Sequence, residues 1–465
     1  MDSSVVKNLM GGDPSVEALS GSGSNRKYFR LTLGNRSAIG VVGTSLEENE
    51  AFLSFDKSFR EIGLPMPEIY AVSPDRMAYL QEDLGNQSLF DIISAKGDYH
   101  DLLAQAVTLL PKIQFEGSKV VDFGKCYPIA DFSQRAIFWD LNYFKYCFLK
   151  ACGIEFDENR LEDDFHALAE ALMSCDTHSF MYRDFQSRNI MVRDGKVHFI
   201  DFQGGRKGPF YYDIVSLLWQ ARANFRQEER MEMLKLYHSS LQQYHSISFE
   251  EFMRNIHYFV LFRTMQVLGA YGFRGFFEKK AHFVQSVPFA LNNMRELLKE
   301  EEFSNLPYLT EVLRKTTECE RFATEQSEGL TVKVRSFSFK KGYPDDNSGN
   351  GGGFVFDCRA LHNPGRYAEY RPFTGMDQCV IDFIEEEGGM QKFLENVYSI
   401  VDASVKKYME RGFTSLMVNF GCTGGRHRSV YAAQHLADHV YEKFNVRVDL
   451  EHIEQKVKRI YTPQQ

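Results

Sequence analysis

Tyr182-Arg183-Asp184-Phe185-Gln186-Ser187-Arg188-Asn189-Ile190-Met191-Val192, followed by His198-Phe199-Ile200-Asp201-Phe202-Gln203, is the stretch that decides the fold. It places an Asp, an Asn five residues later and a second Asp twelve residues beyond that in one hairpin, which turns at Asp194-Gly195. Phosphoryl transfer from ATP needs such a set, because one carboxylate orients and deprotonates a hydroxyl while an amide oxygen and another carboxylate hold Mg²⁺. The pattern predicts Asp184 as the general base and Asn189 and Asp201 as metal ligands.

Two positions separate this motif from that of protein kinases. The protein-kinase pattern is H-R-D-x-x-x-x-N followed by D-F-G, whereas Tyr182 and Gln203 stand here in place of the His and the Gly. Other segments accompany the motif in a fixed order: Ser22-Gly23-Ser24-Asn25-Arg26-Lys27-Tyr28-Phe29-Arg30, Glu82-Asp83-Leu84-Gly85 and Tyr212-Asp213-Ile214. With them, residues 1 to about 316 resemble the aminoglycoside/choline phosphotransferase family, and within it the bacterial kinases of N-acetylmuramate and N-acetylglucosamine that act on the anomeric hydroxyl.

The resemblance implies a fold, cofactors and an acceptor. It implies an α+β kinase-like bilobal fold, with a β-rich N-lobe at 1–85 and a helical C-lobe at 86–316. ATP and Mg²⁺ are the implied cofactors, an amino sugar is the implied acceptor, and cell-wall recycling is the implied context. In the family an Asp at the position of Asp213 braces the catalytic loop. Choline, aminoglycosides and homoserine stay open as acceptors, and Asp213 with Asp140 would be the carboxylates that meet a cationic one.

The N-lobe is expected to bind the nucleotide. Residues 1–20 are expected to end in a helix, and 28–33 and 37–42 to form the hairpin that covers the phosphates. Residues 37–43 contain no Lys to reach the α- and β-phosphates. Arg26 or Arg30 would replace it, since a guanidinium grips phosphate, with Glu48 or Glu50 of a helix at 46–62 as the matching acid. The residues expected to bind ATP are Ser22, Gly23, Ser24, Asn25, Arg26, Arg30, Glu82 and Leu84.

The acceptor side is expected among the aromatic residues of 132–148. Such a dense stripe is usually the core of a helix, but Asp140 is a polar group within it, which is how sugar sites are often built. Asp140 and Arg188 are therefore the candidate substrate contacts, Arg188 because it reaches either phosphate or a neighbouring carboxylate.

Composition agrees with an intracellular enzyme of several domains. The 465 residues are 43% hydrophobic and 14% aromatic, which is ample for two or three cores. No apolar run approaches the roughly 18–20 residues of a membrane helix, and no signal peptide is evident. The eight Cys form no C-x-x-C pair, which argues against zinc and a disulfide framework. A cytoplasmic protein without membrane contact is expected. The net charge of −9 does not indicate a nucleic-acid-binding protein, which would usually be basic.

A small α/β domain is expected at 330–465, after a linker at 317–329. Strands are expected at 330–339, 354–356 and 415–420, and helices at 376–387, 389–411 and 429–442. A glycine-rich loop then joins the last of these strands to a helix, an arrangement that binds anions through main-chain N–H groups and the helix dipole. The loop residues are Cys422, Thr423, Gly424, Gly425, His427, Arg428 and Ser429.

Cys422 and Arg428 also have the Cys-x5-Arg-Ser spacing of thiol phosphatases. A phosphatase needs a low-pKa Cys and an acid on another loop. Asp357 and Asp377 are the candidate acids, but neither lies in a recognisable general-acid loop. Binding of phosphate or a sugar phosphate is therefore favoured over catalysis by Cys422, with a tight structural turn as the alternative.

Residues 330–465 resemble the C-terminal domain of the RapZ RNase-adapter family, through Asp357 to Pro364, Arg371 to Asp377 and Gly421 to Val430. The resemblance implies binding of small regulatory RNA and an amino-sugar phosphate. That family's N-terminal P-loop is missing, since no G-x-x-x-x-G-K-[ST] occurs. Residues 328–465 hold 18 Lys and Arg and 18 Asp and Glu, so 18 − 18 = 0 and charge gives RNA binding no support. Two hypotheses follow: an amino-sugar kinase, or a regulatory adapter with a degenerate kinase domain.

Overall fold

The computed structural model describes residues 2–19, 26–301, 303–319, 329–344, 346, 353–411 and 413–463. The chain divides into two compact units, one of Met1–Phe277 with Ser286–Cys319 and one of Glu278–Gln285 with Glu320–Gln465. The linker expected at 317–329 falls mostly on residues outside this description. Within the described ranges, no helix is long and apolar enough to cross a membrane. All eight Cys are free.

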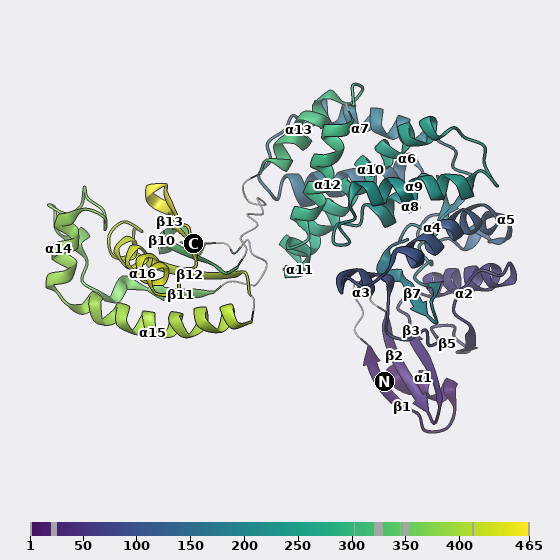
Figure 1. The fold of residues 1–465 in the computed structure, drawn as a ribbon, viewed down its shortest axis with the longest axis horizontal. Helices are drawn as coiled ribbons and strands as arrows, with labels where there is room; N and C mark the ends of the chain where they lie inside the picture. Colours follow the sequence, from purple (N-terminus) through teal and green to yellow (C-terminus); the bar gives the residue numbers. More distant parts are fainter. Residues whose placement is uncertain are drawn as a thin grey trace. The chain divides into compact units, whose positions relative to one another are not determined.

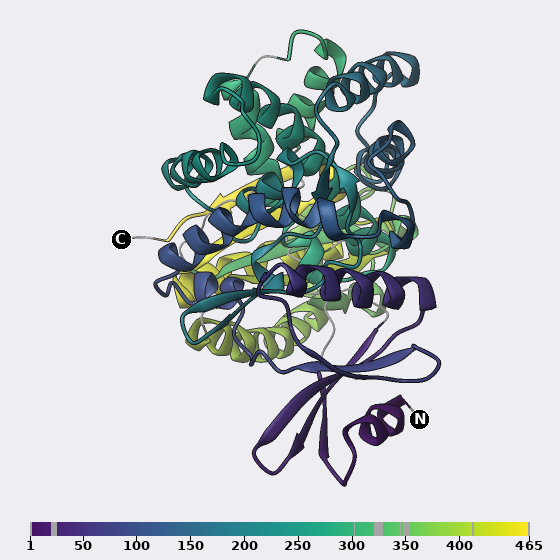
Figure 2. The same cartoon turned by 90° about the vertical axis from the view of Figure 1, so that its right-hand side faces the viewer.

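The first unit begins with a β-rich lobe, which lies at one end of the unit in both views (Figures 1 and 2). Helix α1 (Asp2–Met10) packs on an antiparallel sheet of order β1-β2-β3-β5-β4. The strands are β1 (Ser15–Leu19), β2 (Lys27–Leu33), β3 (Arg36–Val42), β4 (Ile69–Val72) and β5 (Ala78–Glu82). β2 and β3 confirm the strands expected at 28–33 and 37–42. Fully buried Val6 of α1 holds the helix on the sheet, and a Cβ built on Gly40 would lie 2.7 Å from the Val6 Cβ, so the helix needs Gly there.

The helix expected at the end of residues 1–20 is wrong, because Ser15–Leu19 is strand β1. It pairs with β2 from Ser15↔Thr32 to Leu19↔Tyr28. Its side chains are mostly exposed, so the sequence shows no alternation of buried and exposed residues that would predict a strand. The strand forms because its main chain pairs with β2. In the sequence, the glycine-rich segment therefore lies between two paired strands, β1 and β2. Its residues Ser22, Gly23, Ser24 and Asn25 lie outside the described residues.

The helical lobe extends to Thr317, where the expected linker begins. Its helices are α3 (Leu89–Ser94), α4 (His100–Phe115), α5 (Gly117–Val120), α6 (Gln134–Phe144), α7 (Glu158–Met173), α8 (Tyr211–Leu218), α9 (Gln227–Leu241), α10 (Phe249–Gly272), α12 (Val287–Glu300) and α13 (Pro307–Thr317). The short α11 (Ala281–Val284) falls in the segment assigned to the second unit. Helix α13 packs on α7, where Leu309 N donates to Asp164 Oδ2 at 2.6 Å, so it belongs to this lobe.

Two helices of this lobe cross closely and set the positions of site residues. α6 continues into a π-helical turn (Lys145–Leu149), and α10 into another (Phe273–Phe277). A Cβ built on Gly272 would lie 2.2 Å from the Cys147 carbonyl oxygen, and one on Gly269 would lie 2.8 Å from Phe144 N. Only Gly allows this approach, which brings Asp140 of α6 next to the polar face of α10.

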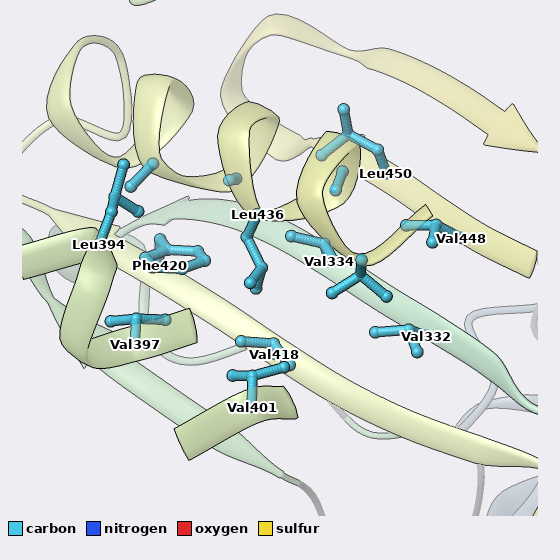
Figure 3. Close-up of a cluster of buried hydrophobic side chains, with 14 of the residues drawn as sticks. Val332, Val334, Leu394, Val397, Val401, Val418, Phe420, Leu436, Val448 and Leu450 are labelled. Atoms are coloured by element: carbon cyan, nitrogen blue, oxygen red, sulfur yellow. The ribbon is translucent and has the colours of Figure 1, made fainter. Parts of the chain in front are cut away.

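The second unit is a five-stranded sheet of order β11-β12-β10-β13-β14. The strands are β10 (Thr331–Ser338), β11 (Phe354–Asp357), β12 (Ser415–Cys422), β13 (Arg447–His452) and β14 (Val457–Tyr461), and the helices are α14 (Gln378–Glu386), α15 (Gly389–Glu410) and α16 (Arg428–Phe444). All strand pairs are parallel except β13–β14. Figure 3 shows Leu394, Val397 and Val401 of α15 and Leu436 of α16 packed on the valines of β10 and β12. The expected α+β kinase-like fold with a small α/β domain is confirmed.

Candidate phosphotransfer site

The loop that carries Asp184 is held by a buried carboxylate. Strand β6 (Ser179–Met181) leads into this loop, and Asp213 on α8 lies beneath it. Asp213 Oδ2 accepts from Tyr182 N at 2.8 Å and Oδ1 accepts from Arg183 N at 2.8 Å. Gln114 adds a bond to Oδ2 at 3.1 Å. Burial raises the pKa of Asp213 to about 7, although the bonds from Tyr182 and Arg183 oppose the rise. Asp213 thus braces the loop, as expected.

The predicted base and metal ligands come together through Asn189. Strands β7 (Ile190–Arg193) and β8 (Lys196–Phe199) pair from Ile190↔Phe199 to Arg193↔Lys196, which brings the ends of the motif together. Asn189 Nδ2 donates to the Asp184 carbonyl at 2.8 Å and to Asp201 Oδ2 at 3.2 Å. Burial, and then the negative charge of Asp184, raise the pKa of Asp201. The two carboxylates are therefore close enough to repel one another.

Gln203 and Tyr182, the two departures from the protein-kinase motif, both hold the Asp201 segment. Gln203 Nε2 donates to Asp201 Oδ1 at 2.7 Å, and the Tyr182 hydroxyl donates to the Ile200 carbonyl at 2.6 Å. Asp201 itself has a φ of +70°, which is unfavourable for a residue other than Gly. The sequence located both residues but gave them no role, because their partners are main-chain and carboxylate groups that only the folded loop brings near.

The residues around Asp201 fit a magnesium ion. With its Nδ2 used in hydrogen bonds, Asn189 keeps its side-chain oxygen as a ligand, and Asp201 supplies a carboxylate beside Asp184. Gln203 Oε1 is buried without a hydrogen-bond partner among the described residues. A cation would neutralise the repulsion between the two carboxylates. Within the described ranges no three His, Cys, Asp or Glu gather into a metal site.

Arg26, at the start of β2, is the N-lobe cation that lies near Asp201. Its Nη2 is 3.5 Å from Glu48 Oε1 on α2 (Leu46–Glu61), and it is almost fully buried. Burial opposes its charge, but Tyr79, Glu48, Tyr28 and Asp201 raise the pKa of Arg26. An Arg–Glu pair thus joins the start of β2 to α2, in a chain whose residues 37–43 lack the Lys that pairs with a Glu in protein kinases. Glu50, the alternative acid, pairs with Arg76 instead.

Arg30 links β2 to the hinge. Its Nε and Nη2 donate to Asp83 at 2.7 and 3.0 Å, and Nη2 also donates to the Gly85 carbonyl at 3.1 Å. Glu82 ends β5 and accepts from Arg193 Nη1 at 2.7 Å. Leu84 is buried. The hinge residues are therefore fixed by side-chain contacts, with Arg30 holding the loop rather than pointing at Asp201.

The two candidate substrate contacts lie near the carboxylates of the motif. Asp140 is close to Arg183 and Arg263, which oppose the rise that burial causes in its pKa. Arg188 is exposed, and its charge acts on Asp201. Of the carboxylates considered for a cationic acceptor, Asp213 is engaged by main-chain N–H groups, and Asp140 lies in the positive field of Arg183 and Arg263.

The predicted anion loop of the second unit joins β12 to α16. Ser338 Oγ donates to the Thr423 carbonyl at 2.9 Å, and a His427 ring nitrogen lies 3.1 Å from the Tyr370 carbonyl. Gly425 has a φ of +62°, and a Cβ built on it would lie 2.8 Å from Ser338 N, so Gly is required there. Around Gly424 no described atom lies within 4 Å of a built Cβ. Part of the loop is thus anchored and part is open.

The chemistry of this loop suits anion binding. Burial acts to raise the pKa of the Cys422 thiol, but hydrogen bonds from the Ser429 side chain and from the main chain of Ser429 and Arg426 lower it overall. Cys422 Sγ and Ser429 Oγ are 3.1 Å apart. Arg428 Nη1 donates to the carbonyls of Arg359 and Leu361, while its Nε is buried without a hydrogen-bond partner in the described part of the chain. Main-chain and guanidinium donors therefore converge at one end of β12.

Neither acid considered for a thiol phosphatase is available to Cys422. Asp357 is paired with Arg359, with 2.7 Å between Oδ2 and Nη2. Asp377 Oδ2 accepts from the main chain and hydroxyl of Thr374 at 2.7 and 2.8 Å. The geometry therefore favours binding over catalysis at this loop.

Comparison with known proteins identifies both units. The sequence model of the phosphotransferase enzyme family matches residues 15–249, half of the chain. The chain belongs to this family. In this phosphotransferase-family chain, a second match covers residues 330–456 and is to the RapZ C-terminal domain.

Curated relatives share the second match. A nucleotide-binding protein of Bacillus velezensis is 38% identical over 138 residues, which are 30% of this chain and 45% of that protein. The nucleotide-binding protein YvcJ of Bacillus subtilis is 36% identical over 138 residues, with the same coverage, 30% and 45%. The chain spans less than half the length of these relatives.

Solved structures resemble the first unit. A thermostable mutant of aminoglycoside phosphotransferase APH(4)-Ia, in a ternary complex with ADP and hygromycin B, has a TM-score of 0.44 and 12% identity, and the match covers 65% of this chain and 99% of that one. Choline kinase from Cryptosporidium parvum Iowa II has a TM-score of 0.44 and 12% identity, with 65% and 93% coverage.

Proposed function

We propose that this chain is an ATP- and Mg²⁺-dependent kinase of an amino sugar of the N-acetylmuramate or N-acetylglucosamine type, acting in the cytoplasm. The observation that carries the proposal is the arrangement of Asn189, whose amide bonds both the main chain of Asp184 and the carboxylate of Asp201. Membership of the phosphotransferase family and the Arg26–Glu48 pair support it.

The proposed reaction assigns a task to each residue. The acceptor hydroxyl oxygen bonds to the γ-phosphorus of ATP, and the bond from that phosphorus to the β–γ bridging oxygen breaks, so ADP leaves with the electron pair. Asp184 orients the hydroxyl, takes its proton and releases it to solvent. Asn189 and Asp201 would hold Mg²⁺, which when bound neutralises phosphate charge. Arg26 would bind a phosphate oxygen of ATP.

The second unit is proposed to bind a phosphorylated ligand, such as an amino-sugar phosphate. Support comes from the buried Arg428 Nε and from the main-chain groups directed at Cys422. The matches to the RapZ C-terminal domain and its relatives favour a second candidate function, a regulatory adapter that binds RNA or protein.

ADP formation by the full chain tests the proposal. The assay contains Mg²⁺, ATP and one acceptor at a time: N-acetylglucosamine, N-acetylmuramate, glucosamine, galactose, choline or an aminoglycoside. We expect turnover of an N-acetyl amino sugar that is lost in Asp201→Ala, and lost in Asp184→Asn with ATP binding retained. Bound ATP without turnover of any acceptor, together with an RNA gel shift at physiological salt, would overturn the kinase proposal and support the adapter.

A further inference from the structure

Three arginines from separate elements gather around Asp140. Arg183 precedes Asp184 in the catalytic loop, Arg206 opens β9 (Arg206–Gly208), and Arg263 lies within α10. Arg206 is 3% exposed and Arg263 is 7% exposed. All three act on the carboxylate of Asp140. Neither the motif nor the comparisons assign these guanidiniums a role.

The cluster adjoins the place where the acceptor hydroxyl must lie. The charge of Asp184 acts on Arg183. The Gly204 carbonyl accepts from Nε and Nη2 of Arg206, each at 3.4 Å. A Cβ built on Gly204 would lie 4.0 Å from Asp184 Oδ2. Through its contact with Gly204, the Arg206 guanidinium therefore lies near the carboxylate that must meet the acceptor hydroxyl.

The arginines differ in how far the fold uses their donors. Arg263 Nε and Nη2 donate to Ser216 Oγ at 3.2 and 3.0 Å, and Nη1 donates to Gln266 Oε1. Arg206 has five donors, yet its hydrogen bonds to described residues are the two long ones to Gly204. Arg263 is thus a positioning residue, and Arg206 is the one equipped to bind a ligand.

Positive charge in the cluster exceeds the negative charge that faces it. Asp140 supplies one carboxylate to three guanidiniums. Asp213, which also acts on Arg263, has both oxygens bound to main-chain N–H groups. Asp184 must meet the acceptor hydroxyl. Burial and the charge of Arg183 lower the pKa of Arg206 to about 10. Burying guanidiniums without enough carboxylates is costly, and a ligand anion offsets that cost.

We propose that Arg183, Arg206 and Arg263 form an anion subsite, so that the acceptor is a sugar bearing a carboxylate. Arg206 donates hydrogen bonds to this carboxylate, and Arg183 and Arg263 add positive electrostatic potential around it. The inference rests on the proposed kinase function, because it concerns the acceptor of the same reaction. It selects N-acetylmuramate, which carries a lactyl carboxylate, over neutral N-acetylglucosamine, and it argues against choline and aminoglycosides.

The two sugars provide a matched test on the unmodified full chain, because they differ only in the lactyl ether. We expect kcat/KM for N-acetylmuramate to exceed that for N-acetylglucosamine by about 10- to 100-fold, as expected of a charge-assisted hydrogen bond. Equal or better use of neutral sugars would overturn the anion subsite and leave the kinase proposal intact. No turnover of any acceptor would overturn both.

Variants at Arg206 test whether this residue causes the preference for N-acetylmuramate over N-acetylglucosamine. Arg206→Gln should lower kcat/KM for N-acetylmuramate by about 10- to 100-fold, mainly through KM, and that for N-acetylglucosamine by less than about threefold. Arg206→Lys keeps the charge but loses the paired N–H donors of the guanidinium, so its kcat/KM for N-acetylmuramate should lie between those of wild type and Arg206→Gln. Arg135→Gln, on exposed α6 surface, is the matched control and should leave both unchanged. Equal loss on both sugars in Arg206→Gln would overturn the assignment.

Discussion

Replacing Asp213 by Asn tests how the catalytic loop is held. Above its pKa of about 7 the side chain is a carboxylate that accepts from Tyr182 N and Arg183 N, each at 2.8 Å. Asn has the same shape but one oxygen, so one of these main-chain N–H groups must face the NH2 group. A buried donor without a partner costs about 1–3 kcal/mol. Removing the buried charge opposes this cost, because a carboxylate whose pKa is raised from 3.8 to about 7 destabilises the folded state above that pH. The two effects offset one another, so we expect the free energy of unfolding of Asp213→Asn to differ from that of wild type by less than about 2 kcal/mol at pH 8.

Urea denaturation followed by tryptophan fluorescence measures this change in the first unit alone, because both Trp139 and Trp219 lie there. The loosened loop should also lower kcat by about 100-fold, since small misplacement of a reacting group has effects of that order. ADP affinity, measured by calorimetry, should be unchanged. Asp98→Asn, at an exposed position, is the control. Wild-type kcat in Asp213→Asn would refute the reasoning, because the loop would then be held without this carboxylate.

Other predictions concern the N-lobe pair, a buried acid and the helix crossing. Glu48→Gln removes the charge 3.5 Å from Arg26, and the Kd for ATP measured by calorimetry should rise about fivefold, or by about 1 kcal/mol. Buried Asp56 on α2 has a pKa raised by burial from 3.8 to about 7, so wild-type stability should fall by up to about 4 kcal/mol from pH 4 to 8. Asp56→Asn should be more stable than wild type in urea at pH 8 and no more stable at pH 4. Gly272→Ala would place a Cβ 2.2 Å from the Cys147 carbonyl oxygen, and a loss of about 1–3 kcal/mol in thermal unfolding is expected.

The sequence predicted the centre of the site because its parts are local. Asp184, Asn189 and Asp201 lie on one hairpin, so their spacing along the chain determines their spacing in space. The choice between Arg26 and Arg30 depended on which side chains face them across the sheet. Strand pairing places Arg30 opposite the hinge and leaves Arg26 with Glu48. Such partners are selected by the register of the sheet, which the sequence alone did not determine.

The arginines around Asp140 could not be predicted from the sequence at all. Asp140, Arg183, Arg206 and Arg263 are spread over more than a hundred residues and meet through the crossing of α6 and α10. No spacing rule predicts such a meeting. Strand β1 was missed because its exposed side chains show no alternation. In both cases the decisive interaction is long-range, a helix crossing for the arginines and main-chain pairing for β1.

The departures from the protein-kinase motif favour an active enzyme over a degenerate one. The segment at Asp201 has a backbone conformation that is costly for Asp, and the surrounding structure must hold it. Tyr182 holds it from one side, Gln203 from the other, and Phe202 stacks on Phe52 of α2 with ring centroids 4.7 Å apart. A site that has lost its chemistry has no need to maintain a strained carboxylate with dedicated contacts. The substitutions at positions 182 and 203 replace the protein-kinase arrangement with another means of fixing Asp201, and a fixed carboxylate beside Asp184 is what preorganised phosphoryl transfer requires.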